Sequence, residues 1–249
     1  LLPGVLGGTV AATLSAVLLG YLSVRHTRIY FSMLTLAFGM MIFSLAWKWR
    51  AVTGGDDGLV GVPRAPLELW ALTVPLPTVE RYYVVVLVAV VAAVALLHRL
   101  VRSPLGLALQ AVRDSEVRAE HVGLPVRRLR LLSFAVAGTC AGLAGSLLPA
   151  LENTVTPPIA HWTASAEPVL AALLGGTQRF GGPLVGAFLL VVSKDVIVRF
   201  TVHWSLVLGA VVIALVLGFR GGVVSVVEPW LARPRPARRA VARAGEQAP

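Results

Sequence analysis

The stretch YYVVVLVAVVAAVALL fills residues 82–97 and contains no charged residue, no glycine and no proline. Arg81 precedes it and His98-Arg99 follow it. About 20 apolar residues in a helix cross the hydrocarbon core of a bilayer, and a run of this length approaches that value before its flanks are added. Since a backbone inside lipid must satisfy its own hydrogen bonds, the stretch predicts a transmembrane α-helix.

The composition of the whole chain agrees with this helix. Of 249 residues, 57% are hydrophobic and 14% are charged, whereas a soluble domain has about 45–50% apolar residues, glycine included, and about 25% charged ones. The mean hydropathy is +0.80. These values predict a polytopic membrane protein and exclude disordered, fibrous and ordinary cytosolic classes. Cys140 is the one cysteine, so the chain forms no internal disulfide.

Five other stretches are long and apolar enough to be spans, and a sixth is shorter. The short stretch, 167–174, is followed by Gly175-Gly176 and is predicted to be a broken or re-entrant helix. We therefore expect an all-α, polytopic transmembrane helix bundle over residues 1–226 and a basic, disordered cytoplasmic tail over 227–249. The predicted spans are 4–22, 29–47, 82–97, 129–151, 183–200 and 204–219.

The positions of the basic residues predict the topology. The net charge is +10. In a membrane protein the positions of the basic residues indicate the orientation of the chain. No nucleic-acid partner is expected. Residues 98–130 contain seven arginines and residues 220–249 contain six, whereas the four basic residues of 48–81 are balanced by four acidic ones. The positive-inside rule then places residues 98–130 and the C-terminus on the cytoplasmic side of the plasma (inner) membrane, and residues 48–81 on the outer side. Residues 98–130 and the C-terminus are then on the same side, so the chain between them crosses an even number of times and the short segment 167–174 has to cross. The same alternation places Leu1 outside, which leads us to expect further spans upstream. No cleavable signal is expected.

The loop at 98–130 is predicted to contain an amphipathic helix over 104–122. Ser103 suits the N-cap and Pro104 the first helical position, while Gly123 suits the end of the helix. Two interpretations are open. The helix could lie at the headgroup boundary, or it could be a coupling helix that docks on a cytoplasmic partner.

Several motifs, in order, resemble the permease subunits of branched-chain amino-acid ABC importers, and the urea and short-chain amide permeases of the same family are similar in these motifs. The resemblance covers about residues 20–225. The chain starts later than members of that family usually do, and His121 stands where they commonly have a small residue. The motifs are YFSMLTLAF (30–38), TGGDDG (53–58), SPLG (103–106), AVRDSE (111–116), RAEHVG (118–123), PVRRLRLLSF (125–134), AGLAG (141–145), LGGT (174–177) and FGGPLVGA (180–187).

The resemblance implies a second homologous permease subunit, two P-loop ATPase subunits and an external substrate-binding protein, besides the lipid bilayer. No Gly-x-x-x-x-Gly-Lys-Ser/Thr motif occurs in this chain, so ATP and Mg would be bound by the partner ATPase, with no cofactor here and no enzyme activity. The residues expected to couple the loop to the ATPase are Arg113, Glu116, Arg118, Glu120 and Gly123. Those expected to form the substrate pathway or gate are Thr35, Gly54, Gly55, Asp56, Gly175 and Gly176.

Three remaining patterns are weighed on their residues. Gly138-x-x-x-Gly142 predicts close helix packing, either within the chain or against the second permease. Asp195 and Arg199 are four residues apart on one span and are predicted to form an intramembrane ion pair, with a substrate or ion contact as the alternative. The five histidines form no set with metal-ligand spacing, so no metal is expected.

The sequence thus favours the transmembrane subunit of an ATP-driven importer of branched-chain or similar small amino acids. The same importer class acting on urea or short-chain amides is one alternative. A stand-alone, ion-coupled secondary carrier is the other, because charged groups inside spans also serve as proton relays.

Overall fold

The computed structural model describes residues 1–25, 29–61, 67–69, 72–74, 79–177, 179–201, 203, 205–207, 209–210 and 212–213. The chain divides into two compact units, Leu1–Ala164 and Ser165–Pro249. The predicted tail, 227–249, lies outside the described residues, and so does most of the predicted span 204–219.

Four helices of the described chain are long and apolar enough to cross a membrane. They start and end within four residues of the predicted spans 4–22, 29–47, 82–97 and 129–151, which confirms an all-α, multi-pass bundle. In the apolar windows of the second and third, no residue is fully buried inside the chain. The four are α1 (Leu2–Ser23), α2 (Ile29–Lys48), α4 (Val79–Val101) and α7 (Val126–Glu152).

A seam of small residues joins α1 to α7 in antiparallel order. A Cβ atom added to Gly138 would lie 2.3 Å from the Cβ of Ala16, and one added to Gly142 would lie 2.4 Å from the Cβ of Ala12. One turn further along each helix, Gly8 meets Ser146 and Gly20 meets Phe134. The Thr13 and Thr139 hydroxyls hydrogen-bond across the seam at 3.0 Å. The Gly138-x-x-x-Gly142 motif is therefore a packing motif, as predicted, and its partner is α1 of the same chain.

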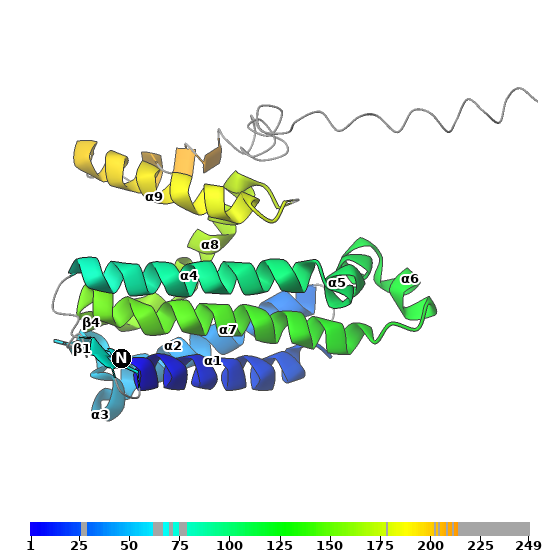
Figure 1. Ribbon diagram of the computed structural model, residues 1–249, viewed down its shortest axis with the longest axis horizontal. Helices are drawn as coiled ribbons and strands as arrows, with labels where there is room; N and C mark the ends of the chain where they lie inside the picture. Colours follow the sequence, from blue (N-terminus) through cyan, green and yellow to red (C-terminus); the bar gives the residue numbers. More distant parts are fainter. Residues whose placement is uncertain are drawn as a thin grey trace, which may run out of the picture. The chain divides into compact units, whose positions relative to one another are not determined.

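Helix α4 is attached to the last turns of α7. Tyr82 is fully buried, and its hydroxyl donates a hydrogen bond to the Leu147 carbonyl at 2.5 Å. Tyr82 packs with Ala150 in a small cluster that also includes Leu1. A buried tyrosine hydroxyl needs such a partner, because an unsatisfied one would cost free energy. The three helices α1, α4 and α7 lie alongside one another in Figure 1.

The two ends of this bundle differ in structure (Figure 1). At one end, named here the sheet end, two short strands pair antiparallel, with Leu59 opposite Val155. At the other end, named here the arginine-rich end, α1 and α4 finish and α7 begins, next to α5 and α6. The elements of the sheet end are α3 (Arg50–Thr53), η1 (Gly55–Asp57), β1 (Leu59–Val60), β4 (Thr154–Val155) and η2 (Pro157–Ala160). A separate antiparallel pair is formed by β2 (Leu67–Leu69) and β3 (Leu72–Val74), and the arginine-rich end carries α5 (Pro104–Asp114) and α6 (Glu116–His121).

The second unit contains α9 (Gly182–Phe200) and most of α8 (Trp162–Gly175). The predicted short helix is α8, which ends at Gly175, before Gly176 with φ 103°. Helix α9 covers the predicted span 183–200, but it carries Lys194, Asp195 and Arg199 and is not among the four long apolar helices.

The seam makes Gly142 a test of the bundle. We expect Gly142→Leu to lower the stability of the protein purified in mild detergent by about 1–3 kcal/mol, because the larger side chain would force α1 away from α7. The readout is the temperature at which half of the protein has aggregated, as monitored by size-exclusion chromatography.

Gly145→Leu is the matched control, since a Cβ at Gly145 meets no atom within 4 Å. Equal losses in the two variants would contradict the assignment of the seam.

Candidate functional site

The loop at the arginine-rich end folds against the first turns of α7. Its core is formed by Val112 of α5, Ala119 of α6, and Val126 and Leu129 of α7, all less than 8% exposed. Gly106 allows α5 to turn closely under the end of α4, because a Cβ there would lie 2.0 Å from the Val101 carbonyl oxygen. The loop is therefore a small packed structure that is continuous with α7.

The predicted helix over 104–122 is wrong in one respect, because it is two helices. Ser115 between them is extended, with φ −165° and ψ 111°, and its Oγ accepts a hydrogen bond from the Arg118 N–H at 3.4 Å. Ser103 caps α5 in the same way, as predicted, accepting from the Gly106 N–H. Serine competes well for backbone amides at helix starts and poorly inside helices. The Asp114-Ser115 pair was the signal in the sequence for this break.

Gly123 ends α6, as predicted. Its φ is 86°, a left-handed conformation that favours glycine. The Gly123 N–H donates to the Glu120 carbonyl at 2.9 Å, and the Leu124 N–H donates to the Ala119 carbonyl at 3.0 Å. This pair of bonds is a Schellman motif, in which the chain reverses and brings Leu124 onto the core of the loop.

The predicted coupling residues separate into two groups. Glu116 accepts a hydrogen bond from the Arg130 guanidinium, so it attaches α6 to α7. Arg113 pairs with its neighbour Asp114 at 3.3 Å, and both side chains are more than 60% exposed. Arg118 and Glu120 are exposed and form no ion pair with the described residues.

Two exposed valines on the same short segment are absent from the residues predicted from the sequence. Val117 is 64% exposed and Val122 is 81% exposed. Val112 and Ala119 are seven residues apart and define the buried face. Val117, two positions before Ala119, is out of phase with that face and could have been recognised as an outer apolar residue. Val122, three positions after Ala119, has the spacing of the buried face, so its exposure could not be read from the sequence. Val117, Arg118, Glu120 and Val122 together are named here the α6 surface.

The predicted gate residues of the first unit lie in two separate places. Thr35 lies inside α2, where its hydroxyl donates to its own helix, at the Phe31 and Ser32 carbonyls. Gly54 and Gly55 lie beyond the far end of α2, about 20 Å away for the 13 residues from Thr35 to Lys48. Both glycines have positive φ, and a Cβ on Gly54 would lie 2.1 Å from the Gly58 carbonyl oxygen. The turn is a tight structural one with Asp56 exposed on it.

The glycines of the second unit let two helices meet at backbone distance. A Cβ on Gly175 would lie 1.7 Å from the Gly182 carbonyl oxygen, and one on Gly186 would lie 1.8 Å from the Ala171 carbonyl oxygen. Leu174 and Leu190 pack beside them with Val212. Gly175 thus has a structural reason to be glycine, and a pathway role for Gly175 and Gly176 stays a prediction.

The charged residues of α9 are paired. Arg199 donates to Asp195 at 3.0 Å, so the predicted i,i+4 pair forms, with both side chains about two-thirds or more exposed. Lys194 donates to Glu167 of α8 at 3.0 Å. This second pair joins α8 to α9.

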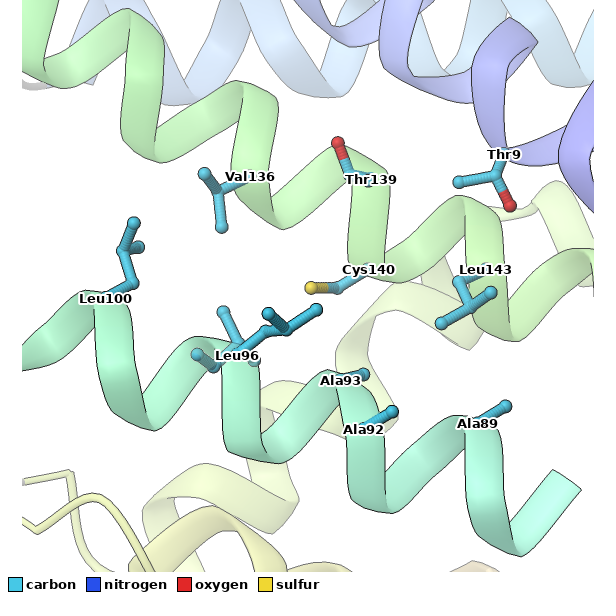
Figure 2. A pocket seen from close by; sticks show the side chains of 11 residues that line it. Thr9, Ala89, Ala92, Ala93, Leu96, Leu100, Val136, Thr139, Cys140 and Leu143 are labelled. Atoms are coloured by element: carbon cyan, nitrogen blue, oxygen red, sulfur yellow. The ribbon is translucent and has the colours of Figure 1, made fainter.

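A cavity of about 430 Å³ lies between α4 and α7, with Thr9 of α1 on one side. Figure 2 shows Ala89 and Leu96 of α4 on one side of it and Cys140 of α7 on the other. The hydroxyls of Thr9 and Thr139 donate to carbonyls of their own helices. The lining has no charged group that could neutralise an ammonium or a carboxylate, so the cavity accommodates aliphatic groups only. Its lining is Thr9, Ala89, Ala92, Ala93, Leu96, Leu97, Leu100, Val136, Thr139, Cys140 and Leu143.

The part of the chain that the structure describes contains no group of three His, Cys, Asp or Glu side chains that could hold a metal.

The comparisons with known proteins decide the family. The family model for the branched-chain amino acid transport system permease component matches residues 1–217. The chain belongs to this permease family. LivM of Escherichia coli, a high-affinity branched-chain amino acid transport system permease protein, is 28% identical over 245 residues, which cover 91% of this chain and 57% of that protein. LivM of Salmonella typhimurium is 29% identical with the same coverage.

A further relative matches over a shorter region. LivH of Methanocaldococcus jannaschii, a probable branched-chain amino acid transport permease protein, is 28% identical over 115 residues, 46% of this chain and 36% of that protein. No solved structure matches this permease. The permease spans a little over half the length of the two LivM proteins, 57% of each.

The Glu116–Arg130 pair gives a test of how the permease holds α6. We expect Glu116→Arg to raise amide hydrogen exchange in residues 116–121 by up to about fivefold, because a partly exposed pair contributes about 1 kcal/mol or less. The double variant Glu116→Arg/Arg130→Glu restores the pair with its charges exchanged, and should restore the protection.

Arg113→Glu is the control, since Arg113 pairs only with its neighbour Asp114 among the described residues. Unchanged exchange in Glu116→Arg would show that the apolar core alone holds α6.

Proposed function

We propose that this permease is the transmembrane subunit of an ATP-driven importer of branched-chain or similar small amino acids, and that α6 is its contact with a partner ATPase. The observation that carries the proposal is the α6 surface, which combines an unpaired charge of each sign with two exposed valines on a segment packed onto α7. Exposed apolar side chains next to charged ones are typical of a protein contact.

The attachment of α6 explains how a push on it would reach the membrane. Val112 and Ala119 pack on Val126 and Leu129, and Glu116 binds Arg130, so α6 moves together with the start of α7. Helix α7 is held along its length to α1 through the seam. A displacement of α6 by the ATPase would therefore be transmitted to α1 and α7 as one rigid pair.

The orientation follows from the charge distribution. The arginine-rich end would face the cytoplasm of the inner membrane, with the C-terminus on the same side, by the positive-inside rule. The sheet end, with Asp56 exposed on its tight turn, would face an external substrate-binding protein. The remaining proposed partners are a second homologous permease subunit and two P-loop ATPase subunits, which would bind ATP and Mg.

The proposed substrate rests on the family and on its relatives. The two LivM proteins are named for branched-chain amino acid transport. The aliphatic cavity does not recognise a whole amino acid, because it offers no charge to the ammonium or the carboxylate. A zwitterionic substrate would therefore be held elsewhere, and we propose the interface with the second permease.

Charge reversal on the α6 surface tests the coupling. We expect Glu120→Lys to reduce uptake of radiolabelled leucine at least tenfold in cells, at an unchanged level in the membrane, because the ATPase contact would meet a like charge. Arg99→Glu is the control, since it reverses a charge at an exposed position of the same end, outside the α6 surface. Normal uptake by Glu120→Lys would remove α6 from the mechanism.

Purification from the native cells in mild detergent tests the partners. We expect a P-loop ATPase and a second permease to remain bound. We also expect leucine uptake by this complex in vesicles to require ATP. A chain that purifies alone and takes up substrate along a proton or sodium gradient would instead be an ion-coupled carrier. Uptake of urea or acetamide in preference to leucine would assign the other branch of substrates.

A further inference from the structure

A second cavity, of about 510 Å³, lies at the arginine-rich end between the last turn of α1 and the first turns of α7. Three arginines line it, one from the turn that follows α1 and two from the first turn of α7, together with a tyrosine of the last turn of α1. Its lining is Tyr21, Val24, Arg25, Arg127, Arg128 and Leu131.

The positive charge of this cavity is not neutralised by the described part of the chain. No carboxylate lines it. Of the nearest acidic residues in sequence, Glu120 is exposed on α6 and is not part of the lining, Asp114 pairs with Arg113, and Glu116 pairs with Arg130. Arg25, Arg127 and Arg128 form no ion pair with any described residue. Three like charges that converge without a counter-charge favour an anion, because each one raises the potential for the others.

Two features add to the attraction for an anion. Arg25 is held in place by a 2.9 Å hydrogen bond to the Tyr21 hydroxyl, with its guanidinium 4.9 Å from the centre of the Tyr21 ring. The first turn of α7 has no side-chain cap and no acidic residue, so its first amide groups and the positive end of its dipole are available at Arg127 and Arg128.

The surroundings indicate where the anion comes from. On the face of α1 that carries Tyr21 and Arg25, Leu18 is 64% exposed and Leu22 is 43% exposed. Tyrosine is enriched at the boundary between hydrocarbon and headgroups. The cavity thus combines three arginines with the apolar residues Val24 and Leu131, next to the exposed leucines of α1.

We propose that this cavity binds the phosphate of an anionic phospholipid, with the three guanidinium groups around the phosphate and the acyl chains along the exposed leucines of α1. A free phosphate ion would use the arginines but would gain nothing from these leucines. An acidic protein segment would have to displace lipid from the leucines. Because the cavity is formed by both α1 and α7, a bound lipid adds a link between these helices beyond their seam.

The test compares lipids and then variants. In native mass spectrometry and in melting measurements on the permease in nanodiscs, we expect dioleoylphosphatidylglycerol to be retained and to raise the melting temperature relative to dioleoylphosphatidylcholine. Arg127→Gln/Arg128→Gln should weaken retention of phosphatidylglycerol about 30-fold, roughly fivefold for each arginine near the surface. Its melting temperature in phosphatidylcholine should equal that of the natural protein, which shows that it folds.

Arg99→Gln/Arg102→Gln is the matched control, because it removes the same charge from exposed positions at the end of α4, outside the cavity. An equal loss in this control would reduce the effect to general attraction and overturn the site. Equal protection by inorganic phosphate without phosphatidylglycerol would assign a soluble anion and overturn the lipid. Loss of a co-purifying ATPase with unchanged lipid retention would assign the cavity to a protein contact, and would also overturn it.

Discussion

The close approach of the α1 and α7 backbones is the constraint on which the rest of the first unit depends. Inside lipid there is no hydrophobic gain from bringing two helices together, so short-range packing and hydrogen bonds have to hold them. Gly138 and Gly142 leave room for Ala16 and Ala12, and the Thr13–Thr139 bond fixes the register. Helix α4 then attaches to α7 through Tyr82, and the loop at the arginine-rich end packs on the first turns of α7. Helix α7 therefore contacts α1, α4 and that loop.

The four long helices and the family could be predicted from the sequence, because both depend on features that are local in the chain. Length and apolarity alone identify a span, so residues 82–97 sufficed to place α4 within a few residues. The break at Ser115 was missed because helical periodicity continues across it: Val112 and Ala119 keep the same face on both sides. The cavity of Figure 2 was also missed, since it arises where alanines of α4 face α7 and leave space, and sequence periodicity does not report the fit between two helices.

The candidate site shows the same division. Ser103 and Gly123 could be assigned to the two ends of the loop structure, since caps obey local rules. The partner of Glu116 could not, because Arg130 lies on another helix, and both residues carry charges that look equally free in the sequence. The same holds for Lys194, whose partner Glu167 is 27 residues away. Charged residues in a membrane protein are thus poorly assigned one by one, since their role depends on which opposite charge the fold brings within 4 Å.

The seam joins two helices that are far apart in the chain, which has a consequence for how the protein is made. Thr13 and Thr139 are separated by 126 positions, so at a synthesis rate of about 5–20 residues per second, α1 waits roughly 6–25 s for its partner. During that interval its row of small residues faces lipid, the insertion machinery or another chain. Biogenesis of this permease therefore includes a period in which α1 is inserted but unpaired, and the time at which α7 emerges sets how long α1 remains open to competing contacts.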